Sequence, residues 1–283
     1  MKKASGKSGV TAGRVISSII VLFLLGVICY ELYQIAIELK ERQEAVSLYE
    51  SLQEKCVKVN KNKLNSIVKK TETDDEIQSK EVMLDVNHVQ LSEANKDYVG
   101  WLYWNFDVED NSKDFTISYP IVKENYVNEY LYTTFEKTSN SAGCIFMDVD
   151  SDAKFKGYSD FLFGHNMKNG TMFGSIDNIY RTKDSDILKT TPQFVYVYTK
   201  EKILKYVVYG YEFTTTADEN AYSYVKSTDE YDAYVNRMQK HSGYKTPMYV
   251  DFYKRPEILN LSTCSGASGT DKRFIVHCVL VSE

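Results

Sequence analysis

Ile258-Leu-Asn-Leu-Ser-Thr-Cys264 and Asp271-Lys-Arg-Phe-Ile-Val-His277 both carry the alternating apolar pattern of a β-strand. A loop rich in glycine and serine, residues 265–270, joins them. The pattern predicts that Cys264 ends one strand and that Arg273 opens the next. A thiol then lies beside a permanent cation, which favours its reactive thiolate form. The two strands therefore indicate covalent catalysis by a cysteine.

A third motif lies upstream, in Phe161-Leu-Phe-Gly-His-Asn-Met-Lys-Asn-Gly170, where His165 follows an apolar strand. Taken singly, each residue has a simpler explanation: a structural histidine, a core cysteine, a solvated arginine. Taken together, and in the order His165, Cys264, Arg273, they resemble the signature of sortases. These are the cysteine transpeptidases of Gram-positive cell surfaces, and the resemblance is greatest to their class B.

Strand patterns recur from residue 98 onward. Tyrosine is frequent, at 23 residues, and proline is scarce, at 4, which favours sheet. The candidate strands are 99–106, 115–122, 143–148, 161–164, 193–198, 203–214, 257–263 and 273–281. About eight strands without regular helix alternation predict a mainly β fold, a closed or nearly closed eight-stranded barrel.

Helices are predicted at two places. Residues 31 to about 70 carry apolar positions at three- and four-residue spacing without glycine or proline. Residues 218–240 interrupt the strand series with helical periodicity, and one face carries Tyr231, Tyr234, Val235 and Met238. A helix inserted before the cysteine strand is similar to class B sortases, whereas class A members usually have a shorter loop. The resemblance spans roughly residues 85–283 and the N-terminal anchor.

The N-terminus predicts a membrane anchor. An apolar run over 15–30 is followed by further apolar positions up to Ile37. Four basic residues precede the run: Lys2, Lys3, Lys7 and Arg14. With this extension the segment is long enough for a bilayer, which needs about 20 residues, and the positive flank stays in the cytoplasm. A cleaved signal peptide is disfavoured because no small-x-small site follows the run. A lipoprotein at Cys29 is disfavoured because no small residue directly precedes it.

These signals predict four segments. Residues 1–14 form a basic cytoplasmic N-terminus, 15–37 a transmembrane signal anchor, 38–80 a helical stalk or linker, and 81–283 an extracytoplasmic catalytic domain. The charged stretch 69–80 favours a linker. The net charge of −5 argues against nucleic-acid binding, which needs a basic surface.

The other cysteines and one acidic turn contain residue types that also occur at functional sites. Cys144 and Cys278 lie on apolar strands and are expected to be buried, and Cys56 has no role that the sequence indicates. The turn Asp148-Val-Asp-Ser-Asp152 begins like a calcium loop. The match then fails, because Ala153 stands where such a loop needs glycine and Ser159 where it needs glutamate. A solvated turn is expected, with no metal and no cofactor.

The resemblance implies a role for each motif residue. Cys264 attacks the peptide carbonyl, and His165 protonates the leaving amine and later deprotonates the incoming one. Arg273 positions the substrate and steadies the oxyanion. Ser262 and Thr263 line the substrate groove by resemblance, or are simply strand residues.

The implied reaction is cleavage of a secreted protein's C-terminal sorting motif after threonine, with a motif similar to Asn-Pro-x-Thr-Asn or Pro-x-Thr-Gly. The protein then passes through a thioester to a cell-wall amine of a peptidoglycan precursor. Two alternatives stay open. One is a pilin-polymerising sortase, although no Asp-Pro-aromatic lid precedes the barrel. The other is a non-enzymatic, anchored β-barrel that binds a surface partner. A papain-like peptidase is disfavoured because its cysteine precedes its histidine.

Overall fold

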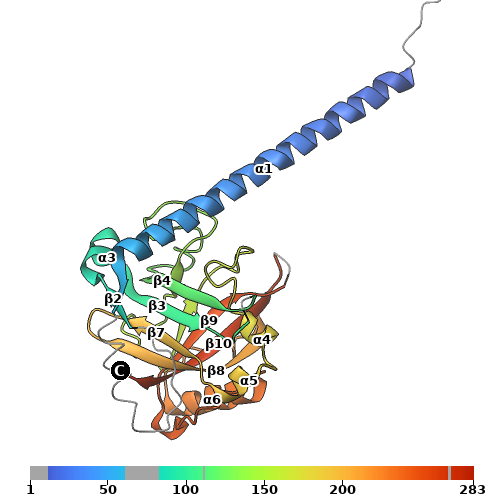
Figure 1. Ribbon diagram of the computed structural model, residues 1–283. Helices are drawn as coiled ribbons and strands as arrows, with labels where there is room; N and C mark the ends of the chain where they lie inside the picture. The colour runs from blue at the N-terminus through green and yellow to red at the C-terminus, as the bar shows by residue number, and fades with distance from the viewer. Residues whose placement is uncertain (1–11, 61–82, 111, 267–268) are drawn as a thin grey trace, which may run out of the picture. The chain divides into compact units, whose positions relative to one another are not determined.

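The computed structural model describes residues 12–60, 83–110, 112–266 and 269–283 of the chain (Figure 1). The chain divides into two compact units, Met1–Glu44 and Ala45–Glu283, and helix α1 (Ala12–Cys56) begins in the first and ends in the second. The large apolar side chains from Val15 to Ile37 are exposed. Within the described part of the chain, α1 alone is long and apolar enough to cross a bilayer.

The second unit is built on a closed β-barrel of eight strands in the order β10-β8-β7-β3-β4-β5-β6-β9. Closure leaves no free sheet edge for another chain to pair with. The strands are β3 (Tyr98–Phe106), β4 (Phe115–Lys123), β5 (Ile145–Met147), β6 (Ser159–Phe163), β7 (Phe194–Tyr198), β8 (Ile203–Thr215), β9 (Ile258–Cys264) and β10 (Lys272–Ser282). The predicted mainly β, eight-stranded barrel is confirmed.

Two of the neighbouring strand pairs in the barrel are parallel, β4 with β5 and β6 with β9. The other six pairs are antiparallel. Parallel neighbours end at the same side of a sheet, so residues that follow β6 and β9 come together. This feature decides where the motif residues meet.

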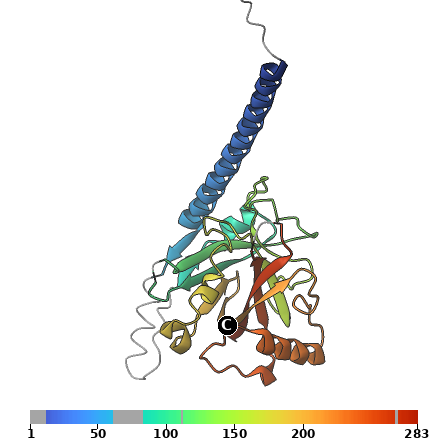
Figure 2. The same ribbon diagram turned by 90° about the vertical axis from the view of Figure 1, so that its right-hand side faces the viewer.

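Helix α6 (Thr228–His241) covers part of the barrel exterior, as Figure 2 shows in orange. Ser227 accepts a hydrogen bond from the Glu230 amide, and the Glu230 carboxylate accepts one from the Lys226 amide, which caps the helix. The four residues predicted to share a face, Tyr231 to Met238, are buried. The predicted start at residue 218 is wrong, because residues 218–227 form a loop.

The N-terminal part of the second unit also departs from expectation. The helix predicted to about residue 70 ends at Cys56, and β1 (Val57–Val59) pairs with β2 (Leu84–Val86). The compact second unit begins at Ala45, and the catalytic domain expected over 81–283 stays a prediction. The expected linker over 69–80 lies outside the described residues. The remaining short helices are α3 (His88–Ala94), α4 (Asn178–Arg181), α5 (Asp186–Thr190) and the 3-10 turn η1 (Phe252–Lys254).

Candidate active site

His165 and Cys264 meet because β6 runs parallel to β9. In this pair Phe163 lies opposite Ser262, so the segments that follow β6 and β9 leave the barrel at the same end. The Gly164 amide donates to the Ser262 carbonyl (3.2 Å), and the Thr263 hydroxyl donates to the Gly164 carbonyl (2.7 Å). A Cβ atom at Gly164 would lie 2.5 Å from Ile145 Cδ1. Glycine therefore lets the chain turn closely past the barrel wall just before His165.

Arg273 is placed by the antiparallel pairing of β9 with β10, in which it lies directly opposite Cys264. One of its terminal nitrogens, Nη1, donates to the carbonyls of Thr270 (3.1 Å) and Lys272 (2.8 Å). Guanidinium carries five N–H donors, and the contacts to these two carbonyls use only Nη1. The side chain is half-buried, whereas Cys264 is exposed.

All five residues singled out in the sequence line one pocket of about 450 Å³: His165, Ser262, Thr263, Cys264 and Arg273. Ser262 and Thr263 are nearly fully buried in its floor. The Asn166 side chain donates to the Cys264 carbonyl (2.8 Å), which ties the segment after β6 to the end of β9. The pocket thus combines a thiol, an imidazole and a cation, the groups that acyl transfer through a cysteine needs.

The imidazole of His165 is oriented by the backbone. Its Nε2 lies 2.7 Å from the Leu131 carbonyl, which can only accept, so Nε2 carries the proton and Nδ1 is the basic nitrogen. The ring of Tyr132 lies 5.4 Å away, centroid to centroid. Burial lowers the pKa of His165, and the hydrogen bond to Leu131 opposes this only partly. The imidazole is therefore mostly neutral at neutral pH.

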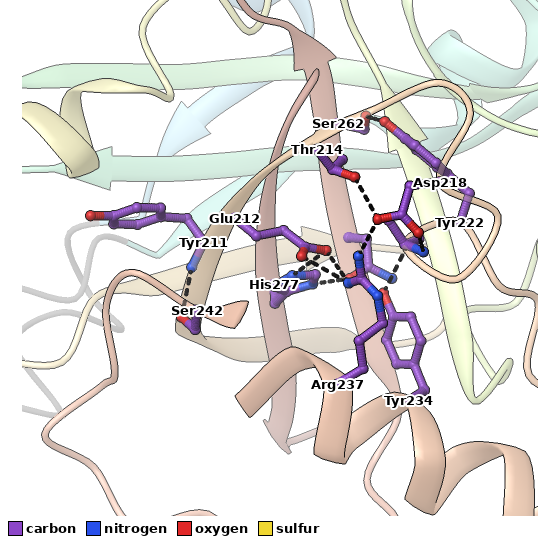
Figure 3. Close-up of polar contacts among 12 residues, drawn as sticks. Tyr211, Glu212, Thr214, Asp218, Tyr222, Tyr234, Arg237, Ser242, Ser262 and His277 are labelled. Carbon is purple, nitrogen blue, oxygen red and sulfur yellow. Dashed lines mark hydrogen bonds and ion pairs between the residues drawn. The ribbon is translucent and has the colours of Figure 1, made fainter. Parts of the chain in front are cut away.

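A partly buried ionic network joins α6 to β8 and to the loop that follows β8 (Figure 3). Arg237 on α6 donates from Nη1 to both carboxylate oxygens of Glu212 (2.6 and 2.8 Å) and from Nη2 to Asp218 (2.6 Å). Asp218 also accepts from the Thr214 hydroxyl and the Ala221 amide. This network anchors the loop that carries Tyr222.

Tyr222 connects that loop to the floor of the pocket, because its hydroxyl lies 2.9 Å from the Ser262 hydroxyl. Glu212 is 2% exposed. Burial alone would raise its pKa, but His277 and Arg237 together bring the pKa below its usual value. His277 is fully buried with Nδ1 2.7 Å from Asn260 Oδ1, so its role is structural.

Replacing Arg237 by methionine should destabilise the fold by about 3–5 kcal/mol, because the buried Glu212 carboxylate loses its cation. Thermal unfolding of the full-length protein in detergent measures this. Arg255→Met is the matched control: its pair with Asp232 (2.8 Å) is more exposed, and solvent screens such pairs, so their loss changes stability little. Equal losses in the two variants would contradict a structural role for the network.

The sequence did not single out several residues that line the pocket: Glu124, Asn128, Leu131, Tyr222 and Tyr224. They come from loops, where no periodic pattern marks the side chains that face a site. The turn 148–152 is only partly solvated, because Asp148 is buried and accepts from the amide and hydroxyl of Ser151. Among the described residues no group of three or more His, Cys, Asp or Glu side chains is placed to hold a metal.

The five cysteines are all free. Cys144 and Cys278 are buried, as predicted, and burial raises the pKa of Cys144 to about 12 and that of Cys278 still further. Cys56 is buried as well. In the second unit Cys264 is therefore the one exposed thiol, and the chemistry of a reactive cysteine falls to it.

Comparison with known proteins identifies relatives of this chain. The sortase domain family model matches residues 113–281. Sortase B of Listeria monocytogenes is 29% identical over 196 residues, which cover 68% of this chain and 73% of that protein. Sortase B of Staphylococcus aureus is 26% identical over 192 residues, with the same coverage.

Solved structures have the same fold. Sortase B from Bacillus anthracis in complex with AAEK1 superposes with a TM-score of 0.60 at 25% identity, covering 87% of this chain and all of that one. The Staphylococcus aureus sortase B–substrate complex superposes with a TM-score of 0.60 at 21% identity, covering 86% and 99%. At that identity the second likeness concerns the fold alone.

Proposed function

Since the chain belongs to the sortase family and resembles its class B members, we propose that it is a cysteine transpeptidase that acts on a sorting motif through a thioester on Cys264. The observation that carries the proposal is the strand register. Parallel β6 and β9, with antiparallel β10, bring His165, Cys264 and Arg273 to one pocket.

In the first half-reaction the Cys264 sulfur attacks the carbonyl carbon of the motif threonine. His165 takes the thiol proton of Cys264 as the sulfur attacks and passes it to the leaving amine as the peptide C–N bond breaks, and the acyl group remains on sulfur as a thioester. Arg273 donates to the oxyanion of the tetrahedral intermediate. The motif would be similar to Asn-Pro-x-Thr-Asn or Pro-x-Thr-Gly, and the released product is the C-terminal tail.

In the second half-reaction an amine attacks the thioester carbonyl. His165 accepts the proton of the amine, a new amide bond forms, and the sulfur leaves as the thiolate of Cys264. We propose that a peptidoglycan precursor supplies this amine. The apolar part of α1 would anchor the enzyme with its basic N-terminus inside and its barrel on the extracytoplasmic face.

The lowered pKa of His165 leads to a pH prediction. Amine transfer needs the neutral imidazole, so its rate should rise with pH through the pKa of His165, below the ordinary value of about 6.5. Single-turnover transfer from the preformed thioester, with the amine in excess, measures this rate. The ratio of wild type to His165→Ala at each pH cancels the protonation of the amine itself.

His165→Ala should lose about 10²–10⁴-fold in transfer at the plateau, the usual contribution of a general base. A ratio that stays near one would remove His165 from the mechanism. A ratio that rises only above neutral pH would contradict the lowered pKa.

A further inference from the structure

The pocket has a strongly acidic end. Glu124, Asp148 and Asp150 line it together with Tyr224, and we call these four residues the acidic end. Asp150 is exposed, whereas Glu124 and Asp148 are buried. Arg273 lines the same pocket at the cysteine. The pocket is therefore polarised, and a ligand that fills it meets a cation near Cys264 and carboxylates at the acidic end.

Glu124 has an unused hydrogen-bond acceptor. It is 4% exposed, and its Oε2 is buried without a hydrogen-bond partner among the described residues. The neighbouring cation Lys123 donates to the backbone carbonyl of Asp148 instead. The Asp148 carboxylate, by contrast, already accepts from Ser151 and from the Tyr224 hydroxyl. A buried acceptor without a donor costs free energy, and a ligand that supplies a donor recovers it.

The electrostatics of Glu124 agree with a missing cation. Burial, with the charge of Asp148 next, raises the pKa of Glu124 to about 7. A perturbed carboxyl in a cleft is typical of a functional site. The described residues offer no cluster for a metal ion, so an ammonium or guanidinium group is the cation that this geometry suits.

The position of the acidic end decides which substrate brings the cation. Glu124 directly follows β4 and Cys264 ends β9, and β5 and β6 lie between these strands. Three steps of about 4.8 Å separate the two strands by ~14 Å along the curved wall of the barrel, well beyond the reach of a bond. The reacting amine must touch the thioester carbon, so it cannot be the group held at the acidic end. The acyl half of the sorting peptide can reach it, because an extended chain spans ~14 Å in about four residues.

We propose that the acidic end binds a lysine or arginine side chain of the sorting peptide, located a few residues before the cleaved bond. This inference rests on the proposed transpeptidase function. Glu124 supplies the buried acceptor and Asp150 the exposed charge. The enzyme then selects cationic sorting segments over neutral ones and holds the acyl half in place until the amine arrives.

Binding to full-length Cys264→Ala in detergent tests the inference without turnover. Fluorescent peptides with an Asn-Pro-x-Thr-Asn core would carry a single lysine at each upstream position in turn, each paired with a norleucine peptide of the same length. At one position the lysine peptide should bind at least about tenfold more tightly, the effect of one hydrogen bond to a charged group.

Glu124→Gln and Asp150→Asn, each added to Cys264→Ala, should reduce that lysine-to-norleucine ratio to about two or less. The ratio cancels any general loss of binding. Glu93→Gln, an exposed residue of α3 outside the pocket, is the matched control and should leave the ratio unchanged. The inference is overturned if no lysine position binds more tightly than norleucine, or if the advantage survives both substitutions.

Cleavage of the norleucine peptides by the wild-type enzyme tests the proposed function on its own. If the norleucine peptides are cleaved and the lysine peptides bind no more tightly, the transpeptidase function stands. The acidic end is then not a specificity site. A lysine preference in binding without any cleavage would count against the transpeptidase alone.

Discussion

Replacing Cys264 by alanine should abolish turnover of sorting peptides while the fold remains intact. The thiol is the nucleophile of the proposed reaction, and no other exposed thiol lies among the described residues of the second unit. Because Cys264 is exposed, its loss should change the free energy of unfolding by no more than about 0.5 kcal/mol. Cleavage of quenched peptides and thermal unfolding of the full-length protein measure the two effects.

Cys29→Ala is the matched control, because Cys29 is the other exposed cysteine and lies in α1. It should cleave peptides at the wild-type rate. Turnover by Cys264→Ala within about tenfold of wild type would remove the thioester from the mechanism. The anchored barrel would then have to be a binding module or use a different nucleophile.

Replacing Arg273 by alanine should lower kcat by about 10²–10³-fold, the usual cost of losing an oxyanion donor. Lysine at this position restores the charge without the forked donors, so Arg273→Lys should recover only part of the loss. Single-turnover acylation, measured as release of the C-terminal tail, isolates the step in which the oxyanion forms.

Lys272→Ala is the control for charge alone, since Lys272 is the exposed neighbour of Arg273 on β10. It should leave acylation within about threefold of wild type. Equal losses in Lys272→Ala and Arg273→Ala would mean that the general positive potential matters and that the position of the guanidinium does not.

The eight strands and the motif residues could be predicted because local sequence determines them. Alternation marks β9 and β10, and their short connection pairs Cys264 with Arg273. Only the resemblance to sortases predicted that His165 lies near Cys264. This proximity depends on the parallel pairing of β6 with β9, which are far apart in the sequence. Pairing between distant strands leaves no local signal in a single sequence.

The wrong predictions have physical reasons of the same kind. Helical spacing of tyrosines predicted a helix from residue 218, but Asp218 is bound to Arg237 and Thr214, and Tyr222 to Ser262, which holds this segment as a loop. The helix predicted to about residue 70 gives way to β1 because Val57–Val59 finds a partner in β2. Asp148 is buried by Tyr224 from a distant loop. In each case tertiary contacts override local propensity.

The central claim is that Cys264 carries the acyl half of a sorting peptide as a thioester. Mass spectrometry of the intact, full-length protein tests it most directly, after incubation with peptides carrying Asn-Pro-x-Thr-Asn, Pro-Pro-x-Thr-Gly and Leu-Pro-x-Thr-Gly cores. The account predicts an adduct on Cys264 with the mass of the segment ending in threonine, and its discharge to an added amine. No adduct and no cleavage with any peptide, while Cys264 of the folded protein also resists alkylation, would contradict it.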